Sequence, residues 1–182
     1  MSNIIVVFPK REVAANIRNL LVHGGFDVLG ACTTGAQAMQ YADTLEEGIV
    51  VCGYKMPDML YTELRNYLPD SFEMLLIASP DRWSDGEVEG VVGLSMPMKV
   101  YDLMNTIEMM TRVIQKRRKK RKEALKNRGQ KQQQVIRKAK ELLMDRNNMS
   151  EEEAHRYLQK SSMNSGTNMA ETAEMVLSIM IE

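Results

Sequence analysis

Apolar residues follow two different spacings along the first hundred residues of the chain. Short continuous runs are typical of strands that are buried on both faces, whereas a recurrence every three or four positions is typical of amphipathic helices. Val13, Ile17 and Leu21, for example, share one face of a helix over 11–23. The continuous runs predict strands at residues 4–8, 26–32, 49–52, 74–78 and 90–94.

These strands alternate with helical segments, and such alternation favours right-handed crossovers around a parallel sheet. Five strands within about a hundred residues are typical of a flavodoxin-like, doubly wound domain. We therefore predict that residues 1–100 form an α/β domain with a five-stranded parallel sheet.

After Pro97 the chain contains no further proline, and its pattern is helical to the end. A long linking helix is predicted over 101–129, with a soft spot at Gly129 and the polar residues 130–134. Apolar residues at the start of this helix have the 4-3-4 spacing of a coiled-coil seam, which could join two chains. The seam residues are Leu103, Ile107, Met110 and Ile114.

Residues 130–182 are predicted to form a small all-α domain of three helices. The second of these helices begins with a capping box, in which Ser150 and Glu153 each accept a hydrogen bond from the other's backbone N–H group. Thr167 or Asn168 caps the third helix. Four methionines are expected to fill the core of this bundle: Met144, Met163, Met169 and Met175.

The formal net charge of zero hides a strong division of charge along the chain. Residues 111–146 carry 15 Lys/Arg against three Asp/Glu, whereas the segments before and after them are acidic. A basic block between acidic blocks is typical of a polyanion-binding protein, although a solvated helix face is the alternative. The block contains seven consecutive basic residues, 116–122.

The residues that most chemistries require are missing from the sequence. Cys32 and Cys52 lie in apolar, strand-like runs and are expected to be packed thiols in a reducing cytoplasm. The sequence has no Cys/His cluster, phosphate-binding glycine motif or nucleophile–base pair, so we expect neither an enzyme nor a bound metal or cofactor. It also has no signal peptide and no apolar stretch long enough to span a membrane, which predicts a cytoplasmic protein.

A resemblance to a known family lies in residues 135–146, 149–158, 161–163 and 168–174. In these segments the C-terminal domain resembles ANTAR domains, the three-helix RNA-binding modules of transcription antitermination regulators. That family commonly has a small residue at the position of Glu141 and often has Arg at the position of Gln159, so RNA affinity or preference could differ here. The resemblance implies a regulator that binds paired hairpins in nascent leader RNA and so prevents a terminator from forming.

Basic residues on the first two helices of this domain are the candidates for RNA contact. Arg137 and Lys140 share a helix face, and Glu141 can pair with Arg137. Tyr157 could stack on an unpaired base or belong to the core. A solvated helix face remains the alternative for the whole set, and the basic run at 116–122 could bind RNA backbone or serve as an open linker. The candidates are Lys131, Arg137, Lys138, Lys140, Arg146, Arg156, Tyr157 and Lys160.

Expected partners follow from the same resemblance. Leader-RNA hairpins are the primary partner, and RNA polymerase would be reached only indirectly. Because two hairpins suit two RNA-binding modules, a homodimer is expected, formed either constitutively or on the RNA.

The first domain is similar to the receiver domains of two-component systems. The strand order agrees, and Met-Pro pairs follow the third and fifth strands, at Met56-Pro57 and Met96-Pro97. A receiver holds Mg²⁺ with an acidic pair after its first strand, where this chain has Phe8-Pro9. The phosphoacceptor aspartate of that family corresponds to Gly53, and its lysine corresponds to Met96.

Three further positions bear on the same chemistry. The Thr/Ser position after the fourth strand is Ala78, or Ser79 if the alignment slips by one, and Asp58 lies beyond the strand end. Phosphoryl transfer to a carboxylate requires the nucleophile and a metal that neutralises the developing charge. We therefore predict a pseudo-receiver that is not phosphorylated by the usual route and that acts as a dimer scaffold or as a sensor of another signal.

Two other classes of protein remain as alternatives. One is a DNA-binding response-regulator-like protein with a helix-turn-helix, although Glu151, Glu152 and Glu153 at the start of the second helix would repel DNA. The other is a coiled-coil adaptor that binds no nucleic acid specifically.

Overall fold

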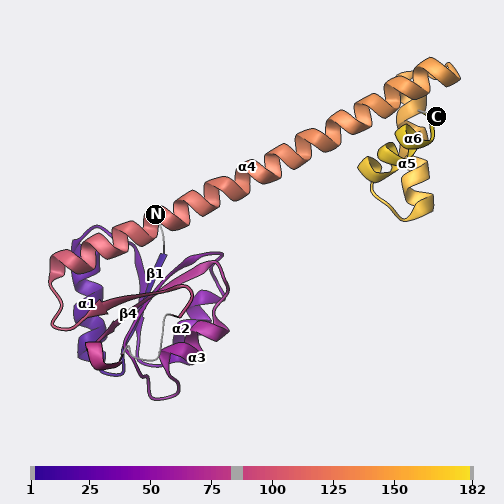
Figure 1. The fold of residues 1–182 in the computed structure, drawn as a ribbon. Helices are drawn as coiled ribbons and strands as arrows, with labels where there is room; N and C mark the ends of the chain where they lie inside the picture. The colour runs from indigo at the N-terminus through magenta and orange to yellow at the C-terminus, as the bar shows by residue number, and fades with distance from the viewer. Residues whose placement is uncertain (1–2, 83–87, 181–182) are drawn as a thin grey trace. The chain divides into compact units, whose positions relative to one another are not determined.

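The computed structural model describes residues 3–82 and 88–180, and the chain divides into two compact units, Met1–Arg118 and Lys119–Glu182 (Figure 1). The first unit holds a five-stranded parallel sheet in the order β2-β1-β3-β4-β5, which confirms the predicted α/β fold. Its elements are β1 (Asn3–Val7), α1 (Arg11–His23), β2 (Val28–Cys32), α2 (Gly35–Ala42), β3 (Gly48–Cys52), α3 (Tyr61–Tyr67), β4 (Phe72–Ala78), the one-turn 3₁₀ helix η1 (Pro80–Arg82), β5 (Val91–Ser95) and the start of α4 (Val100–Asn147).

Helices cover both faces of this sheet, and alternate residues of each strand point to opposite faces. On β1, Ile4 and Val6 belong to one hydrophobic cluster with residues of α1 and α4. Ile5 and Val7 belong to a second cluster with residues of α2 and α3. Burial on both faces explains why the central strands β1, β3 and β4 consist almost wholly of apolar residues. Helix α3, which the periodicity did not reveal, begins where Glu63 accepts a hydrogen bond from the backbone N–H of Leu60 at 2.7 Å.

The predicted coiled-coil seam is wrong. Leu103, Ile107, Met110 and Ile114 are at most 3% exposed, because they pack against the sheet inside the first unit. A 4-3-4 spacing only requires one apolar helix face, and here the sheet covers that face. The first unit accordingly extends to Arg118, well past the predicted boundary at residue 100.

Helix α4 is continuous through the expected soft spot at Gly129. Glycine costs about 1 kcal/mol in a helix interior relative to alanine, and the neighbouring Arg, Lys and Gln residues are good helix formers that tolerate it. The helix ends at Asn147, and Asn148 then adopts a positive φ of 50°, a conformation in which Asn commonly follows a helix.

The second unit contains the three predicted helices: the last part of α4, α5 (Glu151–Ser165) and α6 (Met169–Met180). The capping box is confirmed, since Ser150 Oγ accepts from the N–H of Glu153 at 3.2 Å and the Glu153 carboxylate accepts from the N–H of Ser150 at 2.8 Å. Asn168 caps α6 by accepting from the N–H of Glu171 at 2.9 Å. The buried core consists of Ala139, Leu143, Ala154, Leu158 and Ala173.

The prediction of core methionines is wrong for two of the four residues. Met144 and Met169 pack against the core, as predicted. Met163 and Met175, however, are 76% and 52% exposed. Both lie on exposed helix faces, so methionine alone does not mark a buried face.

Candidate nucleic-acid interface

The candidate residues on α4 lie on two different sides of the helix. Lys131 and Lys138 are seven residues apart and therefore two turns apart on the same side. Arg137 and Lys140, three residues apart, share the other side. Lys131, Arg137 and Lys138 are exposed, whereas Lys140 is half-buried. Arg146 is exposed at the last turn of the helix. One flat RNA surface cannot contact all five at once.

Lys140 also holds the bundle together. Its Nζ lies 2.9 Å from the carboxylate of Glu151, in the first turn of α5, and the lysine side chain is only 19% exposed. The hydrogen bond and the positive charge of Lys140 lower the pKa of Glu151 below its ordinary value. The negative charge also suits the positive end of the α5 dipole. Lys140 thus ties α4 to α5, and its charge is less available to a ligand than the sequence suggested.

Arg137 forms the predicted pair with Glu141, at 3.5 Å. Both side chains are more than 60% exposed, and a pair of this kind contributes a few tenths of a kcal/mol. The pairing therefore leaves the Arg137 guanidinium accessible to a phosphate.

Helix α5 brings its three candidates together on one exposed surface. Lys160 lies one turn after both Arg156 and Tyr157, so the three side chains are neighbours. Tyr157 is 44% exposed, which places it outside the core and leaves one ring face able to stack on a base. Arg156 contacts Glu152 only at 4.0 Å, with both side chains about 80% exposed or more.

Lys131 borders a groove of about 470 Å³ between α4 and the start of α6. Arg128 and Lys131 line one wall, and Glu171 and Glu174 line the other. Opposite charges facing one another across the groove reduce the potential that a polyanion would experience there. This side of α4 is therefore a weaker RNA candidate than the side of Arg137.

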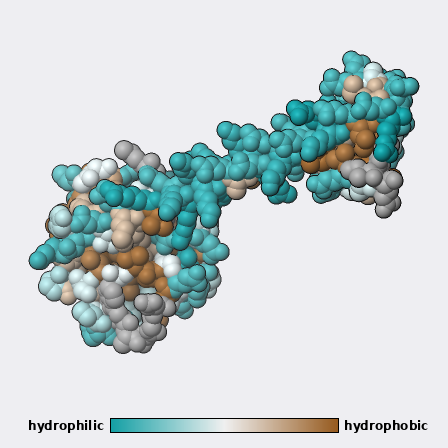
Figure 2. Space-filling model, turned by 45° about the horizontal axis from the view of Figure 1, so that its top comes forward, coloured by the Kyte–Doolittle hydropathy of each residue, from teal (hydrophilic) through white to brown (hydrophobic). Residues whose placement is uncertain are grey.

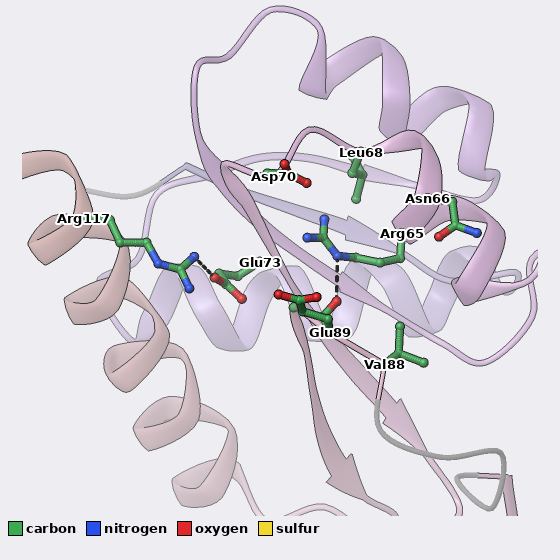
Figure 3. Close-up of a pocket in the computed structure, with 9 residues that line it drawn as sticks. Arg65, Asn66, Leu68, Asp70, Glu73, Val88, Glu89 and Arg117 are labelled. Carbon is green, nitrogen blue, oxygen red and sulfur yellow. Dashed lines mark hydrogen bonds and ion pairs between the residues drawn. The ribbon is translucent and has the colours of Figure 1, made fainter. Parts of the chain in front are cut away.

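Two residues of the basic run form ion pairs within the first unit. Arg117 forms an ion pair with Glu73 at the start of β4, and the glutamate side chain is only 10% exposed (Figure 3). Arg118 lies 3.7 Å from Glu47, just before β3. The second and third residues of the basic run thus anchor α4 to the first unit, a role that the sequence pattern gave no means of finding.

A pocket of about 760 Å³ adjoins the Arg117–Glu73 pair (Figure 3). Arg65 on its wall donates to the backbone carbonyls of Glu89, at 3.2 Å, and Pro69, at 3.4 Å. Its positive charge lies near Asp70, Glu73 and Glu89, so the pocket presents charges of both signs. This arrangement stabilises the loops around it and offers no surplus positive charge to an anion.

The predicted phosphoacceptor position is filled by an apolar side chain. A Cβ atom at Gly53 would lie 3.2 Å from the ring of Phe8, closer than ordinary van der Waals contact. Phe8 is 6% exposed and belongs to the core cluster. A side chain larger than that of glycine at position 53 would therefore require the Phe8 ring to shift by a few tenths of an ångström.

Asp58 has a structural role in the same region. Its two carboxylate oxygens accept hydrogen bonds from the N–H groups of Gly35 and Ala36, each at 2.9 Å, at the start of α2. Partial burial acts to raise the pKa of Asp58, but the hydrogen bonds from Ala36 and Gly35 outweigh it and lower the pKa. The carboxylate is thus engaged with a helix end rather than with the Gly53 position.

Both cysteines are buried free thiols, as predicted. Burial raises the pKa of Cys52 to about 12, and burial together with the charge of Asp58 raises that of Cys32 to about 11. Neither thiol is a nucleophile near neutral pH. Within residues 3–82 and 88–180, no group of three His, Cys, Asp or Glu side chains is placed to hold a metal ion, and no helix is long and apolar enough to cross a membrane.

Comparison with known proteins identifies the second unit. The family model of the ANTAR domain matches residues 122–177, the segment that folds into the last part of α4, α5 and α6. Residues 122–177 form an ANTAR domain. A comparison with curated proteins found no match.

Solved structures match the fold of the chain. The low-resolution structure of the response regulator StyR matches with a TM-score of 0.64 and 19% identity, covering 97% of this chain and 98% of that one. A CheY-like receiver domain protein from Methanospirillum hungatei JF-1 matches at 0.54 and 19% identity over 63% of this chain and 98% of its own. The signal receiver domain of an HD-domain protein from Pseudomonas fluorescens Pf-5 matches at 0.55 and 18% identity, over 65% and 92%. The first unit thus has the receiver fold, and an ANTAR domain follows it.

Proposed function

We propose that this protein is a non-enzymatic regulator that binds hairpins in nascent leader RNA through its ANTAR domain and thereby prevents transcription termination. The observation that carries the proposal is the ANTAR domain at residues 122–177, with Arg156, Tyr157 and Lys160 together on an exposed face of α5. Cations bind the phosphates, and an exposed aromatic ring stacks on a loop base, which is how proteins generally bind single-stranded loops.

We further propose that the first unit acts without phosphorylation at the usual position. Two observations support this: Gly53 offers no carboxylate nucleophile, and a larger side chain at this position would contact the ring of Phe8. RNA binding should then require no phosphodonor. RNA polymerase would be affected only through the RNA.

Two hairpins call for two ANTAR domains, so we propose that two chains act together on one RNA. The contact between the chains does not involve Leu103, Ile107, Met110 and Ile114, because the sheet already covers these side chains. Sedimentation with and without a two-hairpin RNA tests this point, and a protein that stays monomeric in both cases contradicts it.

The test of RNA recognition is selection by the full chain from RNAs that carry two hairpins with randomised loops, without a phosphodonor. Enrichment of a loop sequence is expected, with weaker binding to duplex DNA. Tyr157→Ala should remove one stacked base, which contributes about 1–3 kcal/mol. Arg156→Ala with Lys160→Ala should weaken binding roughly tenfold or more, because two phosphate contacts are lost.

A matched control removes the same charge elsewhere. Arg11→Ala with Arg18→Ala changes two exposed residues of α1 and should leave RNA binding unchanged. Equal, salt-sensitive binding to every RNA and to duplex DNA would instead favour a general polyanion-binding surface. Tighter binding to a DNA sequence would favour the DNA-binding alternative, and no binding at all would favour an adaptor.

A further inference from the structure

The part of α4 that precedes the ANTAR core is exposed on all sides. Every residue from 119 to 134 is exposed except Gly129, which is half-buried. On the face drawn in Figure 2, hydrophilic side chains cover this part of the helix. Apart from Leu125, which is 64% exposed, its side chains are small, polar or charged, and no core covers them. Their exposure makes them accessible to a ligand.

One side of this segment carries an unbroken stripe of cations and amides. Its positions follow a spacing of three or four residues, so they lie within about 80° of one another around the helix. The stripe extends over roughly 27 Å at 1.5 Å per residue. Its members, all in the second unit and all exposed, are Lys119, Lys122, Lys126, Gln130, Gln133 and Arg137.

Carboxylates touch this cation–amide stripe only at its two ends. Glu123 lies 4.0 Å from Lys119, and Glu141 lies 3.5 Å from Arg137. Both pairs are between highly exposed side chains and compete weakly with other anions. Lys122 and Lys126, in the middle, have no ion pair with the described residues.

On the opposite side of the helix, the cations face carboxylates. There Arg128 and Lys131 face Glu171 and Glu174 across the groove, and Arg117, further toward the N-terminus, is paired with Glu73. The middle of the cation–amide stripe therefore faces fewer carboxylates than the opposite side of α4.

We propose that the cation–amide stripe binds the phosphate backbone of an RNA stem, as a second RNA-binding surface next to the loop-binding face of α5. The choice of RNA over other polyanions rests on the proposed function. Duplex RNA is bound mainly through phosphates and 2′-hydroxyls. The lysines supply the phosphate contacts, and Gln130 and Gln133 can donate to or accept from a 2′-hydroxyl, which DNA lacks.

The test uses the full chain and a blunt RNA duplex of about 20 base pairs, long enough for a stem-binding surface, with DNA of the same sequence beside it. Without loops, this probe reports on the stripe even if loop selection fails, so the two proposals can fail separately. The variant is Lys119→Gln, Lys122→Gln and Lys126→Gln, since glutamine preserves the helix.

Removing three phosphate contacts should lower the slope of log affinity against log salt by about 2 to 3 and weaken binding roughly 100-fold near physiological salt. The matched control is Lys116→Gln, Lys120→Gln and Arg128→Gln, which removes three charges from other sides of α4. It should change the slope of log affinity against log salt by less than about 0.9, the contribution of one phosphate contact. Circular dichroism verifies that both variants keep their helix content.

Gln130→Ala with Gln133→Ala tests the choice of RNA. It should reduce the preference for RNA over DNA while leaving the salt slope unchanged, because no charge is removed. The proposal is overturned if the stripe and control variants lose the same amount of affinity for the RNA duplex, or if neither loses any. A wild-type protein that binds the DNA duplex as tightly as the RNA duplex overturns the assignment to RNA.

Discussion

The two units differ in how much of each is devoted to its own core. The first has two hydrophobic clusters, each with 15 buried residues among those described, whereas the second has one cluster of five. The first unit has also filled its expected chemical site with the ring of Phe8. The second leaves Tyr157 and, apart from the half-buried Lys140, its basic side chains exposed. Under the proposed function, the first unit contributes a stably packed fold, and the ANTAR domain supplies the RNA-binding side chains.

Helix α4 supplies a matched pair of substitutions with which to test this difference. Leu103 and Leu143 are both fully buried on the same helix, one in each unit. Truncating a buried leucine to alanine costs about 2–5 kcal/mol, which is most of the stability that a small unit has. Leu143→Ala should therefore unfold the second unit and abolish RNA binding, with the first unit intact.

The reciprocal change should have a different outcome. Leu103→Ala should lower the midpoint of urea unfolding of the first unit and leave RNA binding within about twofold, because the larger core tolerates the cavity. Loss of RNA binding in Leu103→Ala, measured at a urea concentration where the first unit is folded, would show that the units are not separable in this way.

The filled site gives the next largest effect. Gly53→Asp restores a carboxylate at the phosphoacceptor position but forces it against Phe8. Overpacking and burial of a polar group should destabilise the first unit by about 1–3 kcal/mol. Mass spectrometry with a small phosphodonor and Mg²⁺ should detect no phosphorylation of this variant. A phosphorylated Gly53→Asp protein of wild-type stability would contradict the account of a filled site.

The ion pair between α4 and the sheet should have a smaller effect. Arg117→Ala leaves the nearly buried Glu73 carboxylate without its partner, which should cost the first unit about 1–2 kcal/mol after allowance for the exposed guanidinium. Glu73→Gln should cost less, since no unpaired charge remains. Lys116→Ala, one residue away and exposed, serves as the control in urea unfolding and should have no measurable effect.

The smallest effect concerns acid stability of the second unit. Hydrogen bonds from Ser150 lower the pKa of Glu153 below its ordinary value of 4.5. A carboxyl group whose pKa is lower in the folded state contributes stability above pH 4.5, and this contribution is lost as the pH falls through the lowered value. Glu153→Gln should therefore reduce the acid sensitivity of α5 unfolding, followed by circular dichroism. An unchanged pH profile would contradict this role.

The sequence was a better guide to the fold than to the surface. Continuous apolar runs revealed all five strands, of which β1, β3 and β4 are buried on both faces and the edge strands β2 and β5 only in part. Ser150 with Glu153 marked the start of α5 through local hydrogen bonding. The seam at Leu103–Ile114 was misassigned because a spacing shows that a helix has an apolar face but not what covers it.

The candidate site was only partly accessible to sequence reasoning. The exposed cluster on α5 could be foreseen from the spacing of Arg156, Tyr157 and Lys160. The engagement of Lys140 with Glu151, and of Arg117 with Glu73, could not, because each joins elements whose approach depends on the tertiary fold.

Single-round transcription by a bacterial RNA polymerase tests the central claim most directly. The template carries the two-hairpin sequence enriched by the protein, placed so that the second hairpin overlaps a terminator, and no phosphodonor is added. The account predicts that wild-type protein increases read-through and that Leu143→Ala and Tyr157→Ala do not, while Arg11→Ala with Arg18→Ala behaves as wild type. Unchanged termination at protein concentrations that saturate the RNA would contradict the account.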